Sequence, residues 1–168
     1  MGGNAVFTGV VLTRVDDKGR LALPASLRNS IPAEAGGRIY IAFHETMPCL
    51  IGSGADFPTR LEAYLDAREE VAIRRNQDFD RNAASLRLYG GESVPIDGSG
   101  RFTMPELPAA IQGLGQELLM MGRGPYFEIW DLEALRSSDD PALADARRFA
   151  EGAVQLRDKS PPRRGRGA

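Results

Sequence analysis

Short apolar runs separated by polar turn residues open the chain, and this pattern predicts strands. Val10 to Val15 is apolar and rich in β-branched residues, as strands are. Asp17-Lys18-Gly19 predicts a turn, because glycine accepts a positive φ. Leu21-Ala22-Leu23 is expected to return as a second strand. Arg38 to Phe43 and Cys49 to Ile51 are expected to form two more, which predicts a small β-rich unit.

A helical turn is expected between the second and third strands. Pro24 can open it, because the first turn of a helix has no partner for the N–H that proline lacks. Leu27 and Ile31 are four residues apart and would share one face of that helix. A unit of this kind, of roughly 45 residues, is too small to bury a good core alone.

The chain then repeats itself. Val15 to Pro24 matches Ile96 to Pro105 at a constant offset of 81 residues, with aspartate, glycine, arginine and proline identical. Gly36 to Ile41 matches Gly115 to Met120 at an offset of 79 residues. The change of offset predicts a two-residue difference in the length of the linking turn.

The match extends to the last strand and gives the second unit the same order of elements. Cys49-Leu50-Ile51 falls opposite Glu128-Ile129-Trp130, again at an offset of 79. Two such units can complete each other by pairing and interleaving strands, and fusion in one chain favours that pairing. The expected elements of the second unit are strands at Val94 to Ile96, Phe102 to Met104, Glu117 to Met121 and Tyr126 to Trp130, with a short helix from Pro105.

Helices are expected between the units and after them. One opens at Phe57-Pro58, a second covers Asp78 to Leu88, and a third runs from Leu132 to about Leu156, broken or kinked by Pro141. Apolar residues at helical spacing mark their buried faces. These are Leu61, Leu65 and Ala72 in the first, Phe79, Ala83 and Leu86 in the second, and Leu135, Leu143, Ala146 and Ala150 in the third.

The composition narrows the class of protein. The hydrophobic fraction of 42% and the net charge of −2 are ordinary for a globular domain. No apolar run approaches the roughly 18 residues of a membrane-spanning helix, and the N-terminal residues do not resemble a secretory signal. Cys49 cannot form an internal disulfide, which favours a reducing cytosol. His44 is the single histidine and leaves little material for a metal site, so no metal is expected. No cofactor and no small-molecule substrate are expected either.

With these residues in place, the sequence resembles the MraZ family, which carries two SpoVT-AbrB-like units. The two Asp-x-x-x-Arg motifs, Asp16 to Arg20 and Asp97 to Arg101, look like that family's paired signature. The resemblance covers about residues 5 to 135, and its motifs are specific only when taken together. The others are Phe7-Thr8-Gly9, Asp17-Lys18-Gly19-Arg20-Leu21, Cys49-Leu50, Asp97-Gly98-Ser99-Gly100-Arg101 and Phe127-Glu128-Ile129-Trp130.

The resemblance implies a fold and a function. The fold would be α+β and mainly β, with two swapped-hairpin AbrB-like units forming a pseudo-symmetric, double-psi-like β-barrel and helices between and after them. The function would be sequence-specific DNA-binding regulation of transcription, at repeated elements in the promoter of the division and cell-wall gene cluster, its own promoter included. The partners would be double-stranded DNA and further copies of the chain in a ring with the arginine loops on one face. The location would be the cytoplasm and nucleoid.

The expected organisation has five segments. Two are the AbrB-like units, and the basic C-terminal segment is expected to be disordered because its proline- and arginine-rich composition cannot pack a core. The boundaries are 7–54 for the first unit, 55–89 for a helical linker, 90–133 for the second unit, 134–156 for a C-terminal helical segment and 157–168 for a basic tail.

The sequence also departs from the family pattern. Thr8 stands where the family usually has a basic residue, and Ser99 stands where the first unit has a lysine. Leu107-Pro108-Ala109 replaces Ser26-Leu27-Arg28 of the first unit, and its proline is expected to shorten the second helix. The second unit is therefore expected to make fewer phosphate contacts. The tail lies outside the resemblance and is either a solubilising extension or a contact to the DNA backbone.

The arginines of the two motifs are the expected base-reading residues. Arg20 and Arg101 each follow a tight glycine turn, made by Gly19 and Gly100, at the tip of an expected β-ribbon. A two-stranded ribbon fits the major groove, and the planar guanidinium can bond O6 and N7 of a guanine together.

Four further residues have expected supporting roles. Asp16 and Asp97 lie across the turn from the arginines, where a carboxylate can hold the guanidinium or cap backbone N–H groups. Neither carboxylate is expected to touch DNA, because phosphate would repel it. Arg14 and Lys18 are expected to bind phosphates, which sets position without reading sequence.

Other interpretations compete with this one. An isolated Asp-x-x-x-Arg can be a surface ion pair worth under about 1 kcal/mol, but two copies in register favour a shared function. An antitoxin-like barrel that binds a protein partner would have the same architecture, and a co-purified partner would reveal it. An enzyme is not expected, because the chain offers no nucleophile–base set, metal-ligand spacing or nucleotide loop. Glu69 and Glu70 lie among arginines and are interpreted as a solvated helix face.

The remaining conspicuous residues have structural interpretations. Trp130 and Phe127 are expected in the core rather than on a stacking platform, and Cys49 is expected to be a small buried residue. His44 is expected on or near a loop. Gly122-Arg123-Gly124-Pro125 lacks the pattern of a phosphate-binding loop and predicts a hairpin turn.

Overall fold

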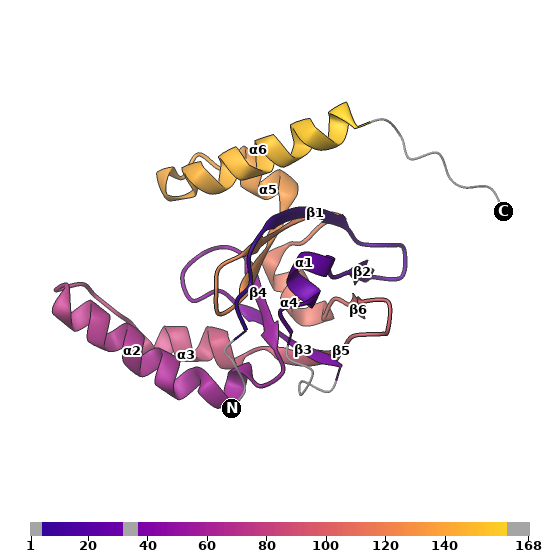
Figure 1. The fold of residues 1–168 in the computed structure, drawn as a ribbon. Helices are drawn as coiled ribbons and strands as arrows, with labels where there is room; N and C mark the ends of the chain where they lie inside the picture. Colours follow the sequence, from indigo (N-terminus) through magenta and orange to yellow (C-terminus); the bar gives the residue numbers. More distant parts are fainter. Residues whose placement is uncertain (1–4, 32–36, 161–168) are drawn as a thin grey trace.

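The computed structural model describes residues 5–31 and 37–160, and both repeats fold in the expected order of elements (Figure 1). The first comprises β1 (Val10–Arg14), β2 (Arg20–Ala22), α1 (Ala25–Arg28), β3 (Arg38–Phe43) and β4 (Leu50–Gly54). The second comprises β5 (Glu92–Pro95), β6 (Arg101–Thr103), α4 (Glu106–Gln112), β7 (Glu117–Gly122) and β8 (Phe127–Asp131). Helices follow each repeat: η2 (Phe57–Arg60), α2 (Leu61–Arg74) and α3 (Arg81–Tyr89) after the first, and α5 (Leu132–Ser137), η3 (Pro141–Leu143) and α6 (Ala144–Lys159) after the second.

The strands of the two repeats interleave. The larger sheet has the order β1-β7-β8-β4-β3-β5, and β2 pairs with β6 in a separate two-stranded sheet. Strand β1 of the first repeat therefore lies beside β7 of the second, and β5 of the second lies beside β3 of the first. Neither repeat completes its sheet without the other, which confirms the expectation of units that interleave their strands.

The registers relate the repeats by an approximate two-fold axis. Arg14 lies opposite Glu117 where β1 meets β7, and Pro95 lies opposite Arg38 at the equivalent place where β5 meets β3. In the two-stranded sheet the equivalent residues Leu21 and Phe102 face each other directly. The axis therefore passes through the middle of the β2–β6 ladder.

The last strand of each repeat corrects the expected alignment. Strands β4 and β8 begin at Leu50 and Phe127, 77 residues apart, rather than at the offset of 79 drawn from Cys49 and Glu128. The pairing agrees with this shift, because it is centred on Ile51 opposite Glu128. The cause is the turn between β7 and β8, residues 123–126, which is two residues shorter than residues 44–49 between β3 and β4.

The prediction that the first strand and the returning strand pair with each other as a two-stranded ribbon is wrong. The turn after β1 carries the chain out of the larger sheet into the smaller one, where β2 pairs with β6. Strand β1 meanwhile pairs along its length with β7. Each strand finds its partner in the other repeat, so the loop between β1 and β2 bridges two sheets.

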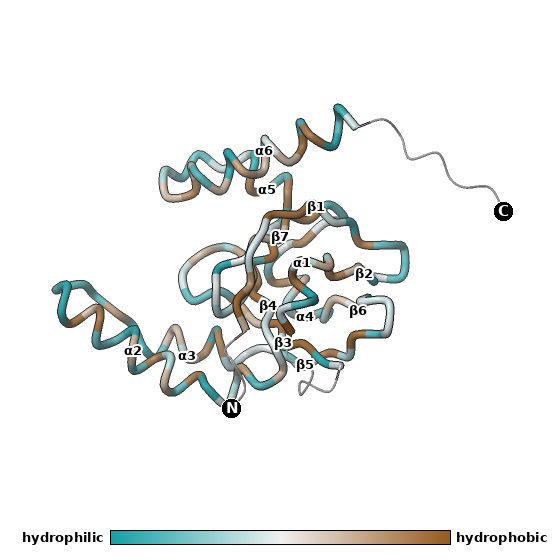
Figure 2. The backbone as a smooth tube through the Cα atoms, viewed as in Figure 1, coloured by the Kyte–Doolittle hydropathy of each residue, from teal (hydrophilic) through white to brown (hydrophobic). Residues whose placement is uncertain are grey.

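Alternate residues of the central strands point to opposite faces of the larger sheet and pack into separate cores. Ile39 and Ile41 of β3 point into the core between the sheets, and Tyr40 and Ala42 pack under α2 and α3. Figure 2 shows hydrophobic colour along these strands and hydrophilic colour along the loop that leads to β2. On β7 the residues Leu118 and Met120 face the inner core, while Leu119 and Met121 pack under α5 and α6 with Trp130, Leu135, Leu143 and Ala150.

The helix after α2 buries a different face from the expected one. Ala84 and Leu88 are buried, and Leu86 is 74% exposed although it was expected to face inward. Asp80 caps the helix by accepting from the backbone N–H of Ala83 at 2.9 Å. Positions four residues apart share a helix face, so burial of Ala84 and Leu88 turns Leu86 toward solvent.

Proline acts differently in α4 and before α6. Helix α4 has seven residues against four in α1, so the expectation that Pro108 shortens it is wrong. Pro108 lies in the first turn, where the missing N–H has no helical partner. Pro141, in contrast, opens a new helical turn after α5 has ended, as expected.

Two further expectations about the helices need correction. Helix α6 continues through Lys159, three residues into the expected tail, and residues 161–168 lie outside the described ranges. Helical residues outnumber strand residues, so the fold is mixed α+β rather than mainly β. In the part of the chain that the structure describes, no helix is long and apolar enough to cross a membrane.

Candidate nucleic-acid interface

The loop between β1 and β2 is built around Asp16. Its Oδ1 accepts from the backbone N–H groups of Lys18 and Arg20, each at 2.9 Å, and its Oδ2 accepts from Nε of Arg20 at 3.0 Å. Gly19 has a φ of 75° and donates its N–H to the Asp16 carbonyl at 3.0 Å. A residue with a side chain would be strained at that φ, so glycine is required for this tight turn.

The loop between β5 and β6 repeats these contacts. Oδ1 of Asp97 accepts from the backbone N–H groups of Ser99 and Arg101 at 2.8 and 2.9 Å. Gly100 has a φ of 79° and donates to the Asp97 carbonyl at 2.9 Å. The ion pair is longer than in the first loop, since Nε of Arg101 lies 3.6 Å from Oδ2 of Asp97.

Backbone hydrogen bonds join the two loops. Leu23 donates its N–H to the Gly100 carbonyl at 2.7 Å, and Met104 donates to the Gly19 carbonyl at 3.1 Å. These bonds are equivalent under the two-fold relation and flank the β2–β6 ladder. The turn glycine of each loop is thus anchored to the strand end of the other repeat, and the loops form one surface.

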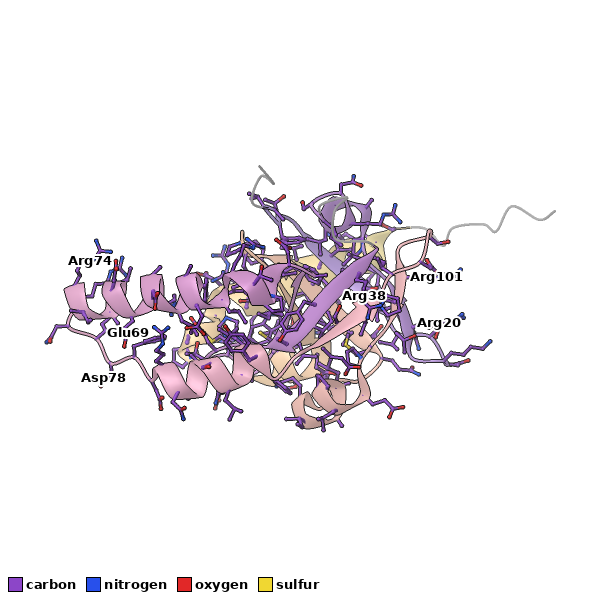
Figure 3. The ribbon with its side chains drawn as sticks, turned by 90° about the horizontal axis from the view of Figure 1, so that it is seen from below. Arg20, Arg38, Glu69, Arg74, Asp78 and Arg101 are labelled. Carbon is purple, nitrogen blue, oxygen red and sulfur yellow. The ribbon has the colours of Figure 1, made fainter. Side chains whose placement is uncertain are left out.

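Both arginines project from the same face of the β2–β6 ladder. Arg20 lies opposite Thr103, and Ala22 lies opposite Arg101, so the four side chains share one side while the residues between them are buried. Diagonal neighbours of this kind have side chains roughly 7–8 Å apart. In Figure 3 the two arginines lie together, at the end of the molecule opposite Arg74 on α2.

The loop contacts lower the pKa of both aspartates. The largest cause is the backbone N–H of Arg20 at Asp16 and the backbone N–H of Arg101 at Asp97. Hydrogen bonding to the charged form favours it. Both carboxylates are therefore ionised at neutral pH, when they can hold a guanidinium.

The structure identifies Arg28 as a further residue of this surface. From the sequence, Arg28 was noted only as part of a segment that differs between the repeats. Its Nη1 donates to the Ser99 carbonyl at 2.9 Å, so a helix of the first repeat supports the loop of the second. The equivalent position on α4 is Ala109, which carries no such group. A contact between residues 71 positions apart has no local sequence signal.

The two expected phosphate-binding residues lie in different settings. Lys18 is exposed at the turn of the first loop. Arg14 is exposed at the end of β1, where its Nη2 donates to Oε1 of Gln116 at 3.2 Å. Arg38 at the start of β3 is held by Ser93 through contacts at 2.7 and 3.0 Å.

The expected core residues are buried. Phe127 and Trp130 are 0% and 3% exposed and face opposite sides of the sheet, and Cys49 is 0% exposed. His44 follows β3, where its Nδ1 accepts from the backbone N–H groups of Thr46 and Met47 at 3.0 and 2.9 Å. Among the described residues, no three His, Cys, Asp or Glu side chains come together as a metal site would require.

Known proteins resemble this chain over most of its length. No family model matches it. A transcriptional regulator MraZ of Herminiimonas arsenicoxydans is 33% identical over 140 residues, which are 83% of this chain and 92% of the relative. The protein of the same description in Methylobacillus flagellatus is 30% identical over 135 residues, 79% of this chain and 85% of the relative. A third, in Pseudomonas putida strain F1, is 26% identical over 153 residues, 91% of this chain and 98% of the relative. Identity at this level over nearly the whole of the relatives shows that the chain belongs to the MraZ family of transcriptional regulators.

Proposed function

We propose that this chain is a sequence-specific DNA-binding regulator that reads base edges with Arg20 and Arg101. Membership in a family of transcriptional regulators makes it a regulator rather than an enzyme. The shared exposed face of the β2–β6 ladder, from which both arginines project, carries the proposal. A two-stranded ladder fits the major groove, about 12 Å wide, in which a guanidinium can bond O6 and N7 of one guanine.

The aspartates orient the arginines for this task. The contact from Asp16 to Arg20 uses Nε, which keeps the terminal pair Nη1 and Nη2 for an outside acceptor. Asp97 has the same relation to Arg101 at a longer distance. The carboxylates do not bind DNA themselves, because phosphate repels them. The hydrogen bonds that hold each loop support a surface formed before DNA binds, which lowers the entropy lost on binding.

Phosphate contacts set the position of this surface. Lys18 and Arg14 lie in and next to the first loop, where they bind the backbone on either side of the element that Arg20 reads. The second loop has Ser99 in place of Lys18, so it contributes fewer contacts. The two loops of one chain therefore bind DNA unequally.

The proposal includes the finer architecture of the family. Residues 7–54 and 90–133 are two swapped-hairpin AbrB-like units of a pseudo-symmetric, double-psi-like barrel, with helical additions at 55–89 and 134–156, and the interleaved ladders support this. Several copies form a ring with the loops on one face, and repeated DNA elements gain affinity by engaging several loops at once. The targets are repeats in the promoter of the division and cell-wall gene cluster, including the chain's own promoter, in the cytoplasm and nucleoid.

Fluorescence anisotropy with promoter DNA tests the proposal. One duplex comes from the region upstream of the chain's own gene and one is a scrambled duplex, each at two salt concentrations. We expect the protein to prefer the promoter and to bind both more weakly as salt rises. Arg20→Ala loses that preference, and Arg101→Ala weakens promoter binding by roughly 1–3 kcal/mol.

Two controls sharpen this test. Arg20→Lys keeps the charge and loses the planar fork, so we expect it to lose the promoter preference while its binding to the scrambled duplex and its salt dependence remain. Arg74→Ala removes a charge at the far end of α2 and leaves the preference intact. Light scattering checks that each variant keeps the oligomer. Equal binding to both duplexes, unchanged in Arg20→Ala, would refute the proposal and direct the search to a protein partner.

A further inference from the structure

Two large apolar side chains are exposed on the outer face of α6. Phe149 is 56% exposed and Leu156 is 71% exposed. The opposite face of the same helix packs on the larger sheet through Ala150 and Val154, which are buried together with Trp130. Figure 1 shows the helix lying across β1. The buried face is sufficient to hold α6 in place, so packing within the chain does not account for the exposed pair.

The exposed pair borders an apolar groove of about 770 Å³ between α6 and β1. Val10 and Leu12 of β1 line it, together with Phe149, Gly152 and Leu156 of α6. Strand β1 is an edge strand of the larger sheet, and natural proteins commonly cover such an edge with another element. A helix laid against this groove would cover the strand edge and the two apolar side chains together.

Gly152 gives a second helix room to approach closely. It lies in the middle of α6, where glycine destabilises a helix relative to alanine. A Cβ built at Gly152 would meet no atom of the described residues within 4 Å, so packing within the chain does not require glycine at this position. A residue without a side chain lets another backbone come near. The position therefore suits a helix crossing better than a solvent-exposed face.

The residues on this face are arranged symmetrically about Gly152. Asp145 precedes it by seven residues and Lys159 follows it by seven, so all three lie on one face of the helix. Phe149 precedes it by three residues and Leu156 follows it by four. If a second α6 runs antiparallel across a two-fold axis at Gly152, each aspartate meets the lysine of the other copy. Each phenylalanine likewise meets the leucine of the other copy.

The remaining polar residues of this face follow the same relation. Arg148 precedes Gly152 by four residues and Gln155 follows it by three, so the guanidinium of one copy faces an amide oxygen of the other. The pairing of Asp145 with Arg148 inside one helix is loose, at 3.8 Å between two side chains that are almost fully exposed. The carboxylate is therefore free to bind the lysine of another copy, and the pattern brings no two like charges together.

We propose that this face of α6 binds α6 of a second copy of the chain, antiparallel and across a two-fold axis at Gly152. Such a contact uses the same patch on both copies and closes on itself. It therefore joins two chains, or two of the proposed rings, and is distinct from the contacts that would build a ring. It goes beyond the proposed function and does not depend on how the loops read DNA. One helix from each copy makes a small interface, so the pairing is weak and depends on concentration.

Sedimentation equilibrium of the full chain over a range of micromolar concentrations tests the pairing. We expect the mass to double as the concentration rises, from one chain to two or from one ring to two. Gly152→Leu places a side chain at the crossing, in space that is open within a single copy. This variant should resist urea better, because leucine favours a helix, and yet lose the doubling. Leu156→Ala should weaken the pairing several-fold, whereas Leu86→Ala on α3, a leucine of similar exposure, should leave it unchanged.

An exchange of charges tests the antiparallel orientation. Asp145→Lys and Lys159→Asp each place like charges opposite each other across the two-fold axis, so each alone should weaken the pairing. The two substitutions combined restore opposite charges at both places and should restore the doubling. Both changes oppose the dipole of α6, so a more stable helix would not explain that recovery.

Three results would overturn the pairing through α6: a doubling that persists in Gly152→Leu, equal losses in Leu156→Ala and Leu86→Ala, or a charge-exchanged chain that pairs no better than the single variants. Anisotropy keeps this proposal separate from the proposed function. Gly152→Leu should keep the promoter preference, and Arg20→Ala should keep the pairing. A protein that pairs without promoter preference refutes only the reading of bases, and one that prefers the promoter without pairing refutes only the contact through α6.

Discussion

Arg28 of the first repeat donates from Nη1 to the backbone carbonyl of Ser99 in the second, at 2.9 Å. The two-fold relation between the repeats would place the equivalent support at Ala109, where there is no donor. The two DNA loops are therefore held differently: the first by a shorter aspartate–arginine pair, the second by an arginine from the other repeat. This asymmetry leads to the first prediction.

Arg28→Ala is expected to weaken promoter binding through the second loop alone. Removal of a buried hydrogen bond to a charged group costs about 1.5–3 kcal/mol. The contact of Arg28 is exposed and its removal costs less, so we expect roughly a three- to tenfold loss of affinity. The test is a double-variant cycle by anisotropy. If Arg28 acts through the second loop, Arg28→Ala adds little to Arg101→Ala and its full effect to Arg20→Ala. Full additivity with Arg101→Ala would contradict this role.

The turn glycines are expected to respond unequally to alanine. At both positions a side chain is strained by the positive φ, at a cost of roughly 1–2 kcal/mol. A Cβ at Gly100 would also overlap Nη1 of Arg28, whereas the nearest atom to a Cβ at Gly19 is 4.0 Å away. Gly100→Ala should therefore lower the denaturation midpoint more than Gly19→Ala.

Arg28→Ala serves as the control for this comparison. In that background the additional cost at Gly100 should disappear, while the cost at Gly19 stays unchanged. Urea denaturation of both glycine variants in each background, with the unaltered protein and Arg28→Ala as references, measures both costs. Equal losses for the two glycines in the unaltered background would show that the Arg28 side chain moves aside freely.

Stability is expected to fall as the pH falls from 6.5 toward 4, because of His44. In the folded protein the pKa of His44 is lowered from its ordinary 6.5 to about 4. Burial is the largest cause, and repulsion from Arg123 and other arginines adds to it. The unfolded chain therefore takes up the proton first as the pH falls through 6.5. Neutral His44 therefore contributes about 3 kcal/mol to the free energy of unfolding above pH 6.5, and this contribution is lost by about pH 4.

His44→Asn isolates this effect. The amide oxygen of asparagine can accept from the backbone N–H groups of Thr46 and Met47 as Nδ1 does, and it does not titrate. Chemical denaturation at pH 7.5 and pH 5 should show a smaller difference in the variant than in the unaltered protein. An equal difference in both proteins would assign the pH dependence to groups other than His44.

The sequence was sufficient for the repeat, the turn chemistry and most of the buried helix faces. These depend on local rules: glycine at a positive φ, aspartate as an acceptor for nearby N–H groups, and apolar residues three or four positions apart. The site residues lie within a few positions of one another along the chain, so their grouping could be predicted from a short window around Asp16 and another around Asp97.

The partner of each strand could not be predicted in this way. Apolar alternation indicates that Leu21 and Phe102 lie in strands, but it contains no information on which strand lies beside which. The expectation of a local ribbon at β1 and β2 failed for this reason. The prediction of the buried face of α3 failed for a similar reason. Whether Ala84 or Leu86 is buried depends on where α2 lies, and both positions fit an amphipathic helix.

The pairing of β1 with β7 has a consequence for synthesis of the protein. Arg14 emerges from the ribosome long before Glu117, its partner across the ladder. At typical rates of about 5–20 residues per second, the interval is roughly 5–20 s. During that time β1 presents a strand edge without its native neighbour, a template that other chains can join. We therefore expect that slower translation of the second half increases the fraction of newly made copies that associate before folding is complete.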